Sequence, residues 1–322
     1  MKRKMKLMKE RVSVLLLLMV IPVCILQMAF RPGNTVGKIE LGRRLFFDPI
    51  LSSDSSVSCA SCHREQFAFA DTSAVSIGVH GRKGKRNTPT IMNILLGRKF
   101  FFWDGRAASL EEQALKPIED PSEMNLPLGE AISRLRKNEQ YRNDFQNVFH
   151  QLPDTANLAA AIAAFERTLE TSNSIFDEWK FSDNPAAVSD EVKKGFELFN
   201  GKAKCVRCHF GADFTTQEFR NIGLFDGMKL NDSGRSAITK NREDLGKFMT
   251  PTLRNIELTA PYMHNGMFGT LDEVIEFYND TRKLVSNPIN RDTILSQPLG
   301  LSAREKAELK GFLLSLTDKR FK

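Results

Sequence analysis

The sequence contains few of the residues that most often carry metal and redox chemistry. Its 322 residues include only five cysteines, five histidines, three tyrosines and two tryptophans. At these frequencies a single Cys-x-x-Cys-His pentapeptide is expected by chance only about 0.001 times in such a chain. The chain nevertheless carries two copies, Cys59-Ala-Ser-Cys62-His63 and Cys205-Val-Arg-Cys208-His209. Chance is therefore excluded as their origin.

Some classes of function lack support. The basic segment around Lys83, Lys85 and Arg86 has neither the spacing nor the following Ser or Thr of a phosphate-binding loop. The formal net charge is +7, but residues 1–11 carry six positive charges and one negative charge, which leaves +2 for the remainder. A nucleic-acid partner is therefore not indicated.

The two pentapeptides indicate covalent c-type haem. In this motif the two thiols add to the porphyrin vinyl groups, and the adjacent histidine supplies the proximal nitrogen to iron. Zinc is the alternative, since paired Cys-x-x-Cys segments also bind zinc. Each pair here is followed directly by histidine, and together the motifs use every cysteine except Cys24. We therefore expect two covalently bound haems, one held by Cys59, Cys62 and His63 and the other by Cys205, Cys208 and His209.

The N-terminal segment indicates export. Residues 1–11 are basic and residues 12–30 are almost wholly apolar, which is the order found in a secretory signal. A run of about 19 apolar residues is also long enough to stay as a membrane anchor, although Pro22 and Gln27 weaken that alternative. We expect residues 1–30 to be a signal peptide or an N-terminal anchor. The remainder is then periplasmic, which agrees with haem attachment outside the bacterial cytoplasm.

The exported part is long enough for two domains, and an internal sequence repeat predicts that they share one fold. Gly42-Arg-Arg-Leu45-Phe46 precedes the first haem motif, and Gly195-Phe-Glu-Leu198-Phe199 precedes the second. Each predicts the N-terminal helix of a cytochrome c domain. A stretch of Asp, Asn, Pro and small residues predicts a linker over residues 181–189. We therefore expect an N-terminal domain at residues 31–181 and a C-terminal domain at residues 190–322.

The predicted fold class is mainly α, because few stretches alternate with period two. Capping boxes that begin at Thr270 and Ser302 predict helices to about residues 279 and 316. Long loops are expected over residues 78–106 and 210–269. An apolar stripe predicts helix within residues 155–179, and its members are Leu158, Ile162, Phe165 and Leu169.

Haem attachment does not by itself establish catalysis. A six-coordinate haem only passes electrons, whereas an open iron site can bind peroxide or oxygen. Taken singly, the candidate residues fit ordinary roles: core packing for Trp103 and Tyr278, and an exposed carboxylate for Glu123. Only their combination can decide between the two kinds of haem protein.

Order and spacing together resemble the bacterial dihaem cytochrome c peroxidase family, which includes the MauG-type enzymes. The resemblance covers about residues 42–317, nearly the whole exported part. Besides the haem motifs, the segments that carry it are Leu45-Phe-Phe-Asp48, Gly84-Lys-Arg-Asn87-Thr-Pro, Phe102-Trp-Asp-Gly-Arg106, Glu112-Gln113-Ala, Glu123-Met124, Pro251-Thr-Leu-Arg-Asn255 and Pro261-Tyr-Met-His264-Asn-Gly.

The resemblance implies a peroxidatic N-terminal haem and an electron-transfer C-terminal haem. Trp103 is similar to the family's tryptophan between the haems, Glu123 to its distal acid, and Gln113 to the accompanying pocket residue. The chemistry agrees, because a carboxylate beside bound peroxide can move a proton from the inner to the outer oxygen. The family also implies one calcium ion between the domains, with oxygen ligands from Asn87, Thr259 and Pro261.

Two positions depart from the family pattern. The displaceable distal histidine of the peroxidases aligns with Val79. His80 follows one residue later and is the candidate distal ligand of the first haem iron if the loop shifts. The methionine ligand of the second haem aligns with Tyr278, and a tyrosine ligand is what the MauG-type branch has. Phenolate lowers the iron potential relative to methionine. Met263 and Met267 are the alternative ligands for that iron.

Three functions stay open at this point. The first is a periplasmic peroxidase that reduces hydrogen peroxide with electrons from a small monohaem cytochrome c or similar carrier. The second is a MauG-type oxidase of a protein or organic substrate, and the third is a non-enzymatic dihaem electron carrier. Glu123 and Gln113 argue against the carrier, whereas Val79 and Tyr278 leave the two enzymes unseparated. A homodimer and a monomer are equally compatible with the sequence.

Overall fold

The computed structural model describes residues 33–94 and 97–322. The export segment lies outside them. No helix of the described part is both long and apolar enough to cross a membrane. The elements are mainly helical: α2 (Gly33–Phe47), α3 (Cys59–Cys62), α4 (Leu110–Glu119), α5 (Leu128–Lys137), α6 (Glu139–Phe149), α7 (Thr155–Glu166), α8 (Ile175–Phe181), α9 (Asp190–Asn200), α10 (Ser236–Thr239), α11 (Leu271–Asn279) and α12 (Ala303–Leu314), with strands β1 (Phe219–Arg220) and β2 (Phe248–Met249).

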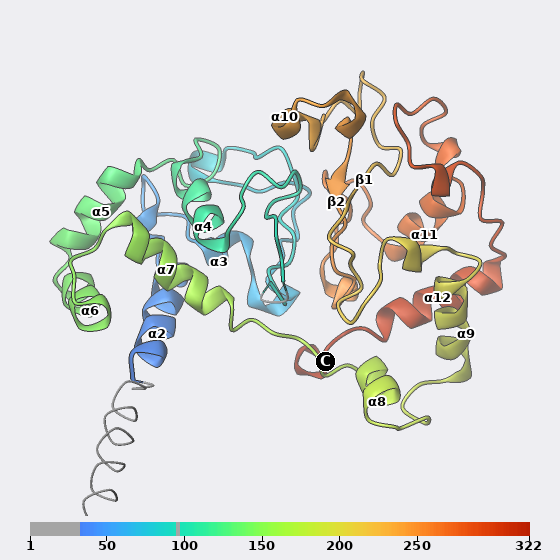
Figure 1. The fold of residues 1–322 in the computed structure, drawn as a ribbon, viewed down its shortest axis with the longest axis horizontal. Coiled ribbons are helices and arrows are strands. Elements are labelled where there is room, and N and C mark those ends of the chain that lie inside the picture. The colour runs from blue at the N-terminus through green and yellow to red at the C-terminus, as the bar shows by residue number, and fades with distance from the viewer. Residues whose placement is uncertain (1–32, 95–96) are drawn as a thin grey trace, which may run out of the picture.

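The fold consists of two halves, each with its own hydrophobic core. In Figure 1 the blue-to-green half carries α2 to α7, and the yellow-to-red half carries α9 to α12. The β1 and β2 strands form one short antiparallel pair, in which Phe219 lies opposite Met249. The prediction of a mainly helical chain with long loops is confirmed.

The two halves repeat one helix crossing. In the first half, a β-carbon built on Gly42 of α2 would lie 1.9 Å from the carbonyl oxygen of Ala161 on α7. In the second, a β-carbon on Gly195 of α9 would lie 2.0 Å from the carbonyl oxygen of Glu308 on α12. Glycine is therefore what lets each helix pair approach backbone to backbone.

Matching aromatic contacts fill both crossings. The ring centroids of Phe46 and Phe165 are 5.1 Å apart, and those of Phe199 and Phe312 are 5.0 Å apart. The pairs come from the sequence echo around Gly42 and Gly195, so this repeat is structural as well as sequential. Such edge-to-face and tilted contacts stabilise packed aromatic rings by about 0.5–1.5 kcal/mol each.

The helix expected within residues 155–179 is interrupted. The α7 helix ends at Glu166 and α8 begins at Ile175. In the intervening stretch, Asp318 near the C-terminus accepts hydrogen bonds from Thr171, Ser172 and Asn173. Short polar side chains and a captured backbone compete with helical hydrogen bonds there. The Thr270 and Ser302 capping boxes do open α11 and α12, as predicted.

The chain crosses from the first core to the second before it reaches residues 181–189, the predicted linker. Leu169 belongs to the first core, whereas Phe176 of α8 packs in the second, with its ring centroid 5.8 Å from that of Phe312. Figure 1 shows the C-terminus returning to this junction, where Lys319 N–H donates to Asn173 O. The packing therefore favours a division near residues 170–175, and the domain limits themselves remain a prediction.

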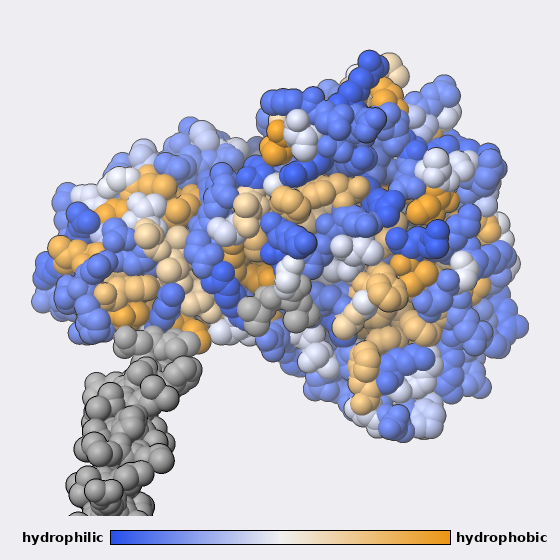
Figure 2. Space-filling model, viewed as in Figure 1, coloured by the Kyte–Doolittle hydropathy of each residue, from blue (hydrophilic) through white to orange (hydrophobic). Residues whose placement is uncertain are grey.

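Polar contacts join the halves. Arg86 of the first half binds Asp232 of the second at 2.7 Å and Asp104 at 2.6 Å. The Asn93 amide donates to Asp213 at 2.6 Å. The outer surface on the face drawn in Figure 2 is mostly hydrophilic, with apolar side chains in separate patches.

Candidate active site

The second Cys-x-x-Cys-His motif borders a deep cavity in the C-terminal half. The space it encloses is about 1600 Å³, including the part that is open to solvent. Cys205, Cys208 and His209 lie on its wall. The remaining lining is mostly aliphatic or aromatic and includes Phe199, Leu253, Ile275, Leu309 and Leu313. A large apolar cavity with two thiols and an imidazole at its wall fits a covalently held haem.

Both motif histidines are held in the orientation that a haem ligand needs. His63 Nδ1 lies 2.9 Å from Phe69 O, and His209 Nδ1 lies 2.9 Å from Phe214 O. A carbonyl oxygen can only accept, so Nδ1 carries the proton and Nε2 is free to bind iron. Burial lowers the pKa of His209 to about 4 and also lowers the pKa of His63, so the neutral form is favoured. The two motifs lie in separate cores, so no shared zinc site is formed.

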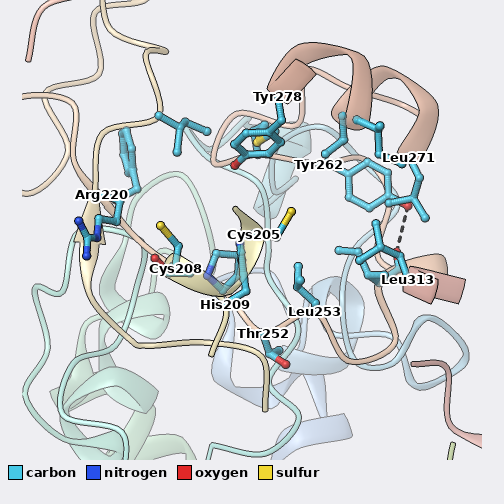
Figure 3. A pocket seen from close by; sticks show the side chains of 18 of the residues that line it. Cys205, Cys208, His209, Arg220, Thr252, Leu253, Tyr262, Leu271, Tyr278 and Leu313 are labelled. Carbon is cyan, nitrogen blue, oxygen red and sulfur yellow. Dashed lines mark hydrogen bonds between the residues drawn. The ribbon is translucent and has the colours of Figure 1, made fainter. Parts of the chain in front are cut away.

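Tyr278 faces His209 across the second cavity. Figure 3 shows the tyrosine ring from α11 on one side and the histidine on the other, with the two cysteines between them. Burial, and then the charges of Cys208 and Cys205, raise the pKa of Tyr278. From this position Tyr278 would be able to bind the iron of a haem held by the second motif. Met263 also lines this cavity and remains the alternative, whereas Met267 is not among the lining residues.

The first motif forms the whole of α3, with His63 as its C-cap, and lies against the aromatic crossing of its half. The Phe46 ring centroid is 6.3 Å from that of His63 and 6.2 Å from that of Phe69. The Cys59 and Cys62 thiols are mostly enclosed, and burial raises the pKa of Cys62 to about 11. The arrangement is the counterpart of the second site, with Phe69 in the place of Phe214.

Glu123 lies near the first motif, and its role as the distal carboxyl stays a prediction. It sits in the turn after α4, where its carbonyl accepts the Val79 N–H at 2.8 Å. Burial, with a smaller contribution from Asp120, raises the pKa of Glu123 to about 7. In addition to burial, the Glu123 charge raises the pKa of both Cys59 and Cys62. The carboxyl therefore acts electrostatically on both cysteines of the first motif.

Gln113 and His80 differ in how far they are buried. Gln113 is half-buried on α4, the helix that ends just before the turn containing Glu123. His80 is turned to solvent: 57% of its side chain is exposed and its Nδ1 lies 3.3 Å from Asp54. In this conformation Val79 is fully buried beside Glu123 instead. The proposal of His80 as an iron ligand therefore requires the loop to rearrange.

Trp103 belongs to the first half but lines the cavity of the second. Its indole N–H donates to Asn87 O at 2.8 Å, and its carbonyl accepts the Met249 N–H from β2 at 2.8 Å. The ring is thus fixed at the junction by contacts from both sides. The role of Trp103 as the residue between the haems stays a prediction.

The residues proposed for calcium also gather at this junction. Asn87, Thr259 and Pro261 all border the second cavity. The Asn87 N–H donates to His264 O at 2.8 Å, and its side-chain amide donates to Ser73 O at 3.1 Å. Among the described residues no hydrogen bond uses Asn87 Oδ1, so this oxygen is available to a cation. A carboxamide oxygen with backbone carbonyls is a donor set that suits calcium.

Sequence reasoning missed two features of the site. The first is the ion pair of Arg86 with Asp104 and Asp232, which flanks Trp103 and joins the halves. The second is Glu166, which is only 4% exposed at the end of α7. A signal for Glu166 was present, because this acidic residue follows directly on the apolar stripe residue Phe165.

Comparisons with known proteins agree with this geometry. A family model for di-haem cytochrome c peroxidases matches residues 37–185. The chain is 37% identical over 292 residues to the methylamine utilization protein MauG of Methylorubrum extorquens, covering 88% of this chain and 78% of that protein. It is 38% identical over 258 residues to the cytochrome c551 peroxidase of Nitrosomonas europaea, covering 79% of this chain and 76% of the relative.

Solved structures show the same likeness. A MauG-like protein associated with microbial copper homeostasis matches with a TM-score of 0.80 and 34% identity, over 88% of this chain and 90% of that one. The dihaem peroxidase BthA of Burkholderia thailandensis shares the fold, with a TM-score of 0.77 and 24% identity over 90% of this chain and 87% of that one. The chain therefore belongs to the dihaem cytochrome c peroxidase family, a group of oxidoreductases that also includes MauG.

Proposed function

We propose that this protein is a periplasmic peroxidase that reduces hydrogen peroxide to water with electrons from a small cytochrome c. The observation that carries the proposal is Glu123, an enclosed carboxyl with a pKa of about 7 beside the first haem motif. A general acid–base group works best when its pKa is close to the working pH. A carrier with two closed irons has no use for such a group at that place.

The residues divide the chemistry between the two sites. Thioethers from Cys59 and Cys62 would hold the first haem, with His63 Nε2 on its iron, and the second motif would hold the other haem likewise. A c-type haem with an open sixth position supplies an iron that binds peroxide and accepts electrons. Glu123 would take the proton from one peroxide oxygen and deliver it to the other, which would leave as water when the O–O bond breaks.

Electrons have to cross from the second site to the first. Each peroxide needs two electrons and two protons to yield two waters. Trp103 is held between the halves by Asn87 and Met249, which supports its ring as the aromatic group that would shorten the path between the haems. A calcium ion at Asn87 and the Thr259 and Pro261 carbonyls would lie beside the same indole and hold both halves in register.

A second function, MauG-type oxidation of a protein or organic substrate, is favoured by Tyr278. Its ring faces His209 across the cavity (Figure 3). An anionic phenolate on that iron would stabilise its oxidised state and make it a poor entry point for electrons from an ordinary cytochrome. Both candidate functions share peroxide activation at the first site and differ in what is oxidised at the second.

The test is peroxide turnover by the purified protein carrying both haems. Reduced monohaem cytochrome c and hydrogen peroxide are supplied, and oxidation of the cytochrome is followed. We expect two cytochromes oxidised per peroxide, and no turnover by a Cys59→Ala/Cys62→Ala variant that lacks the first haem. A peroxide-reactive protein that ignores the cytochrome but oxidises an aromatic protein substrate would overturn the peroxidase in favour of the MauG-type oxidase.

Location and assembly are parts of the same proposal. The basic and apolar segment of residues 1–30 supports export to the periplasm, with or without a retained anchor. Fractionation of cells and N-terminal sequencing of the mature protein test both points, and sedimentation of the purified protein distinguishes a monomer from a homodimer.

A further inference from the structure

A buried carboxyl close to the first haem site is not used by the proposed chemistry. Glu166 is the last residue of α7 and is 4% exposed. Its Oε2 atom has no hydrogen-bond partner among the described residues. Burying a polar oxygen without a hydrogen-bond partner is costly, so the group is retained at some expense in stability. Its position calls for a functional explanation.

The internal repeat shows what belongs at this position. Gly42 packs against Ala161 and Phe165 of α7, and Gly195 packs against Glu308 and Phe312 of α12. In both helices the two contacted residues are four apart, so Phe165 and Phe312 are equivalent. The residue that follows is Glu166 in the first half and Leu313 in the second.

Leu313 is a wall residue of the second haem cavity, as Figure 3 shows. Glu166 therefore occupies the place of an apolar wall residue of the other haem. An independent observation agrees: after burial, the Glu166 charge is the largest influence that raises the pKa of Cys59. Cys59 is the first cysteine of its motif, as Cys205 is of the second.

The neighbouring charges do not neutralise Glu166. Arg167 is adjacent in the chain, but its guanidinium makes two hydrogen bonds to Glu111 of α4, at 2.7 and 3.0 Å. The remaining acidic group that acts on Cys59 is Glu123. Burial raises the pKa of Glu166 to about 8, with Arg167 opposing and Glu111 adding to the shift. The carboxyl is therefore mostly protonated at neutral pH.

We propose that Glu166 is a second carboxyl of the first haem site, close to Cys59, and that it would release its proton on oxidation of a haem held there. One electron leaves the iron for a one-electron oxidant, and one proton leaves Glu166 for solvent, so the net charge of the enclosed site is unchanged. An uncompensated charge in an apolar enclosure would be expensive. The inference rests on haem attachment at Cys59 and Cys62, and it is independent of the physiological substrate.

The experiment measures the midpoint potential of the first haem against pH by spectroelectrochemistry, with ferricyanide as the oxidant. It is done in a Glu123→Gln background, which removes the other carboxyl that titrates near neutrality. With Glu166 present, the potential should fall as the pH rises toward about 8 and then level off, because the ionised carboxylate favours the oxidised iron. Glu166→Gln and Glu166→Leu should both keep the high potential and lose this pH dependence.

Three controls make the result specific. Glu166→Leu installs the side chain that the second half already carries, so a loss of fold is not expected. Glu170→Gln removes an exposed carboxyl four residues away and should change nothing, and the potential of the second haem should be the same in all variants. In redox-difference infrared spectra, the band of a protonated carboxyl should disappear with Glu166→Gln.

Retention of the full pH dependence in both Glu166 variants would overturn the proposal, as would its absence in the parent. Loss of one haem from the parent protein would instead mean that the assignment of the first haem site is wrong. A haem count on each preparation separates these outcomes.

Discussion

At the scale of single residues, Glu123 takes its chemistry from its surroundings rather than from its type. The chain has 39 acidic residues, most of which need no special explanation. Glu123 differs because a turn places it beside Val79 and next to the cysteines of the first motif. Enclosure raises its pKa to about 7, where both of its protonation states are accessible.

Replacing Glu123 by glutamine should slow peroxide turnover by about 10²–10⁴-fold, the usual contribution of a positioned acid–base group. The amide has nearly the same shape as the carboxyl, so both haem spectra should be retained. It cannot accept the peroxide proton, so turnover should fall. Stopped-flow measurement of the peroxide reaction checks this. Unchanged turnover would show that Glu123 is an ordinary carboxylate.

The same residue predicts a pH profile. The carboxyl can accept a proton only when it is ionised, and its raised pKa delays ionisation until about pH 7. The rate of the peroxide step should therefore rise with pH through about 7 and then reach a plateau. In Glu123→Gln this rise should be absent.

Tyr278→Phe should open the iron site at the second haem. Removing the phenol oxygen leaves His209 as the sole protein ligand, so the second haem should change from low to high spin in its electron paramagnetic resonance spectrum. Tyr262→Phe is the matched control, because Tyr262 lines the same cavity but donates its hydroxyl to Ile256 O at 2.9 Å. If the two variants give the same spectrum, the ligand is another residue, with Met263 next.

At the scale of elements, each half of the molecule contains one helix crossing that depends on a glycine. A β-carbon on Gly42 would meet the backbone of α7, which cannot move aside as a flexible side chain can. The α9–α12 crossing depends on Gly195 in the same way. These contacts position Phe46 and Phe199 beside the two haem sites.

Gly42→Ala should therefore destabilise the protein by about 1–3 kcal/mol, the usual cost of overpacking a core. Gly129→Ala on α5 is the control, because a β-carbon there meets nothing within 4 Å, and alanine is favoured over glycine in helices by about 1 kcal/mol. Urea denaturation of the haem-loaded proteins measures both. Equal midpoints for the two variants would contradict the role assigned to the crossing.

At the scale of the whole molecule, the proposed electron transfer depends on the junction between the halves as well as on the two sites. Trp103, the Arg86 ion pairs and the proposed calcium ligands all meet there. The first half thus contributes to the lining of the second cavity through Asn87 and Trp103. Electron transfer should depend on this contact rather than on the two haem domains separately.

Trp103→Phe keeps the aromatic bulk but gives a ring that is harder to oxidise. Peroxide should still react with the first haem, while delivery of electrons from the second becomes slower in single-turnover kinetics. Trp179→Phe is the control, because the other tryptophan packs against Phe176 and Phe196 within the second core. A parallel slowing of both steps would indicate a general disturbance instead.

The halves should also load haem separately. Cys59→Ala/Cys62→Ala should keep one haem that resists acid–acetone extraction, and Cys205→Ala/Cys208→Ala should keep the other, because each motif lies in its own core. The wild-type protein should hold two. Extractable haem in the wild type would disprove covalent attachment.

The sequence alone determined the features that depend on short segments. The two haem motifs, the repeated Gly-x-x-Leu-Phe segment and the capping boxes at Thr270 and Ser302 are local, because their chemistry lies within a few residues. The resemblance to the family was likewise carried by short motifs at characteristic spacings, and it named Glu123, Trp103 and Tyr278.

Only the tertiary structure decided the features that depend on distant contacts. The break between α7 and α8 is made by Asp318, about 150 residues away in the chain from Thr171. The direction of His80 depends on Asp54, and the enclosure of Glu166 depends on the helices packed around it. A local sequence pattern does not reveal these three features. Hydrogen bonds between distant residues and burial away from solvent arise only when the chain is folded.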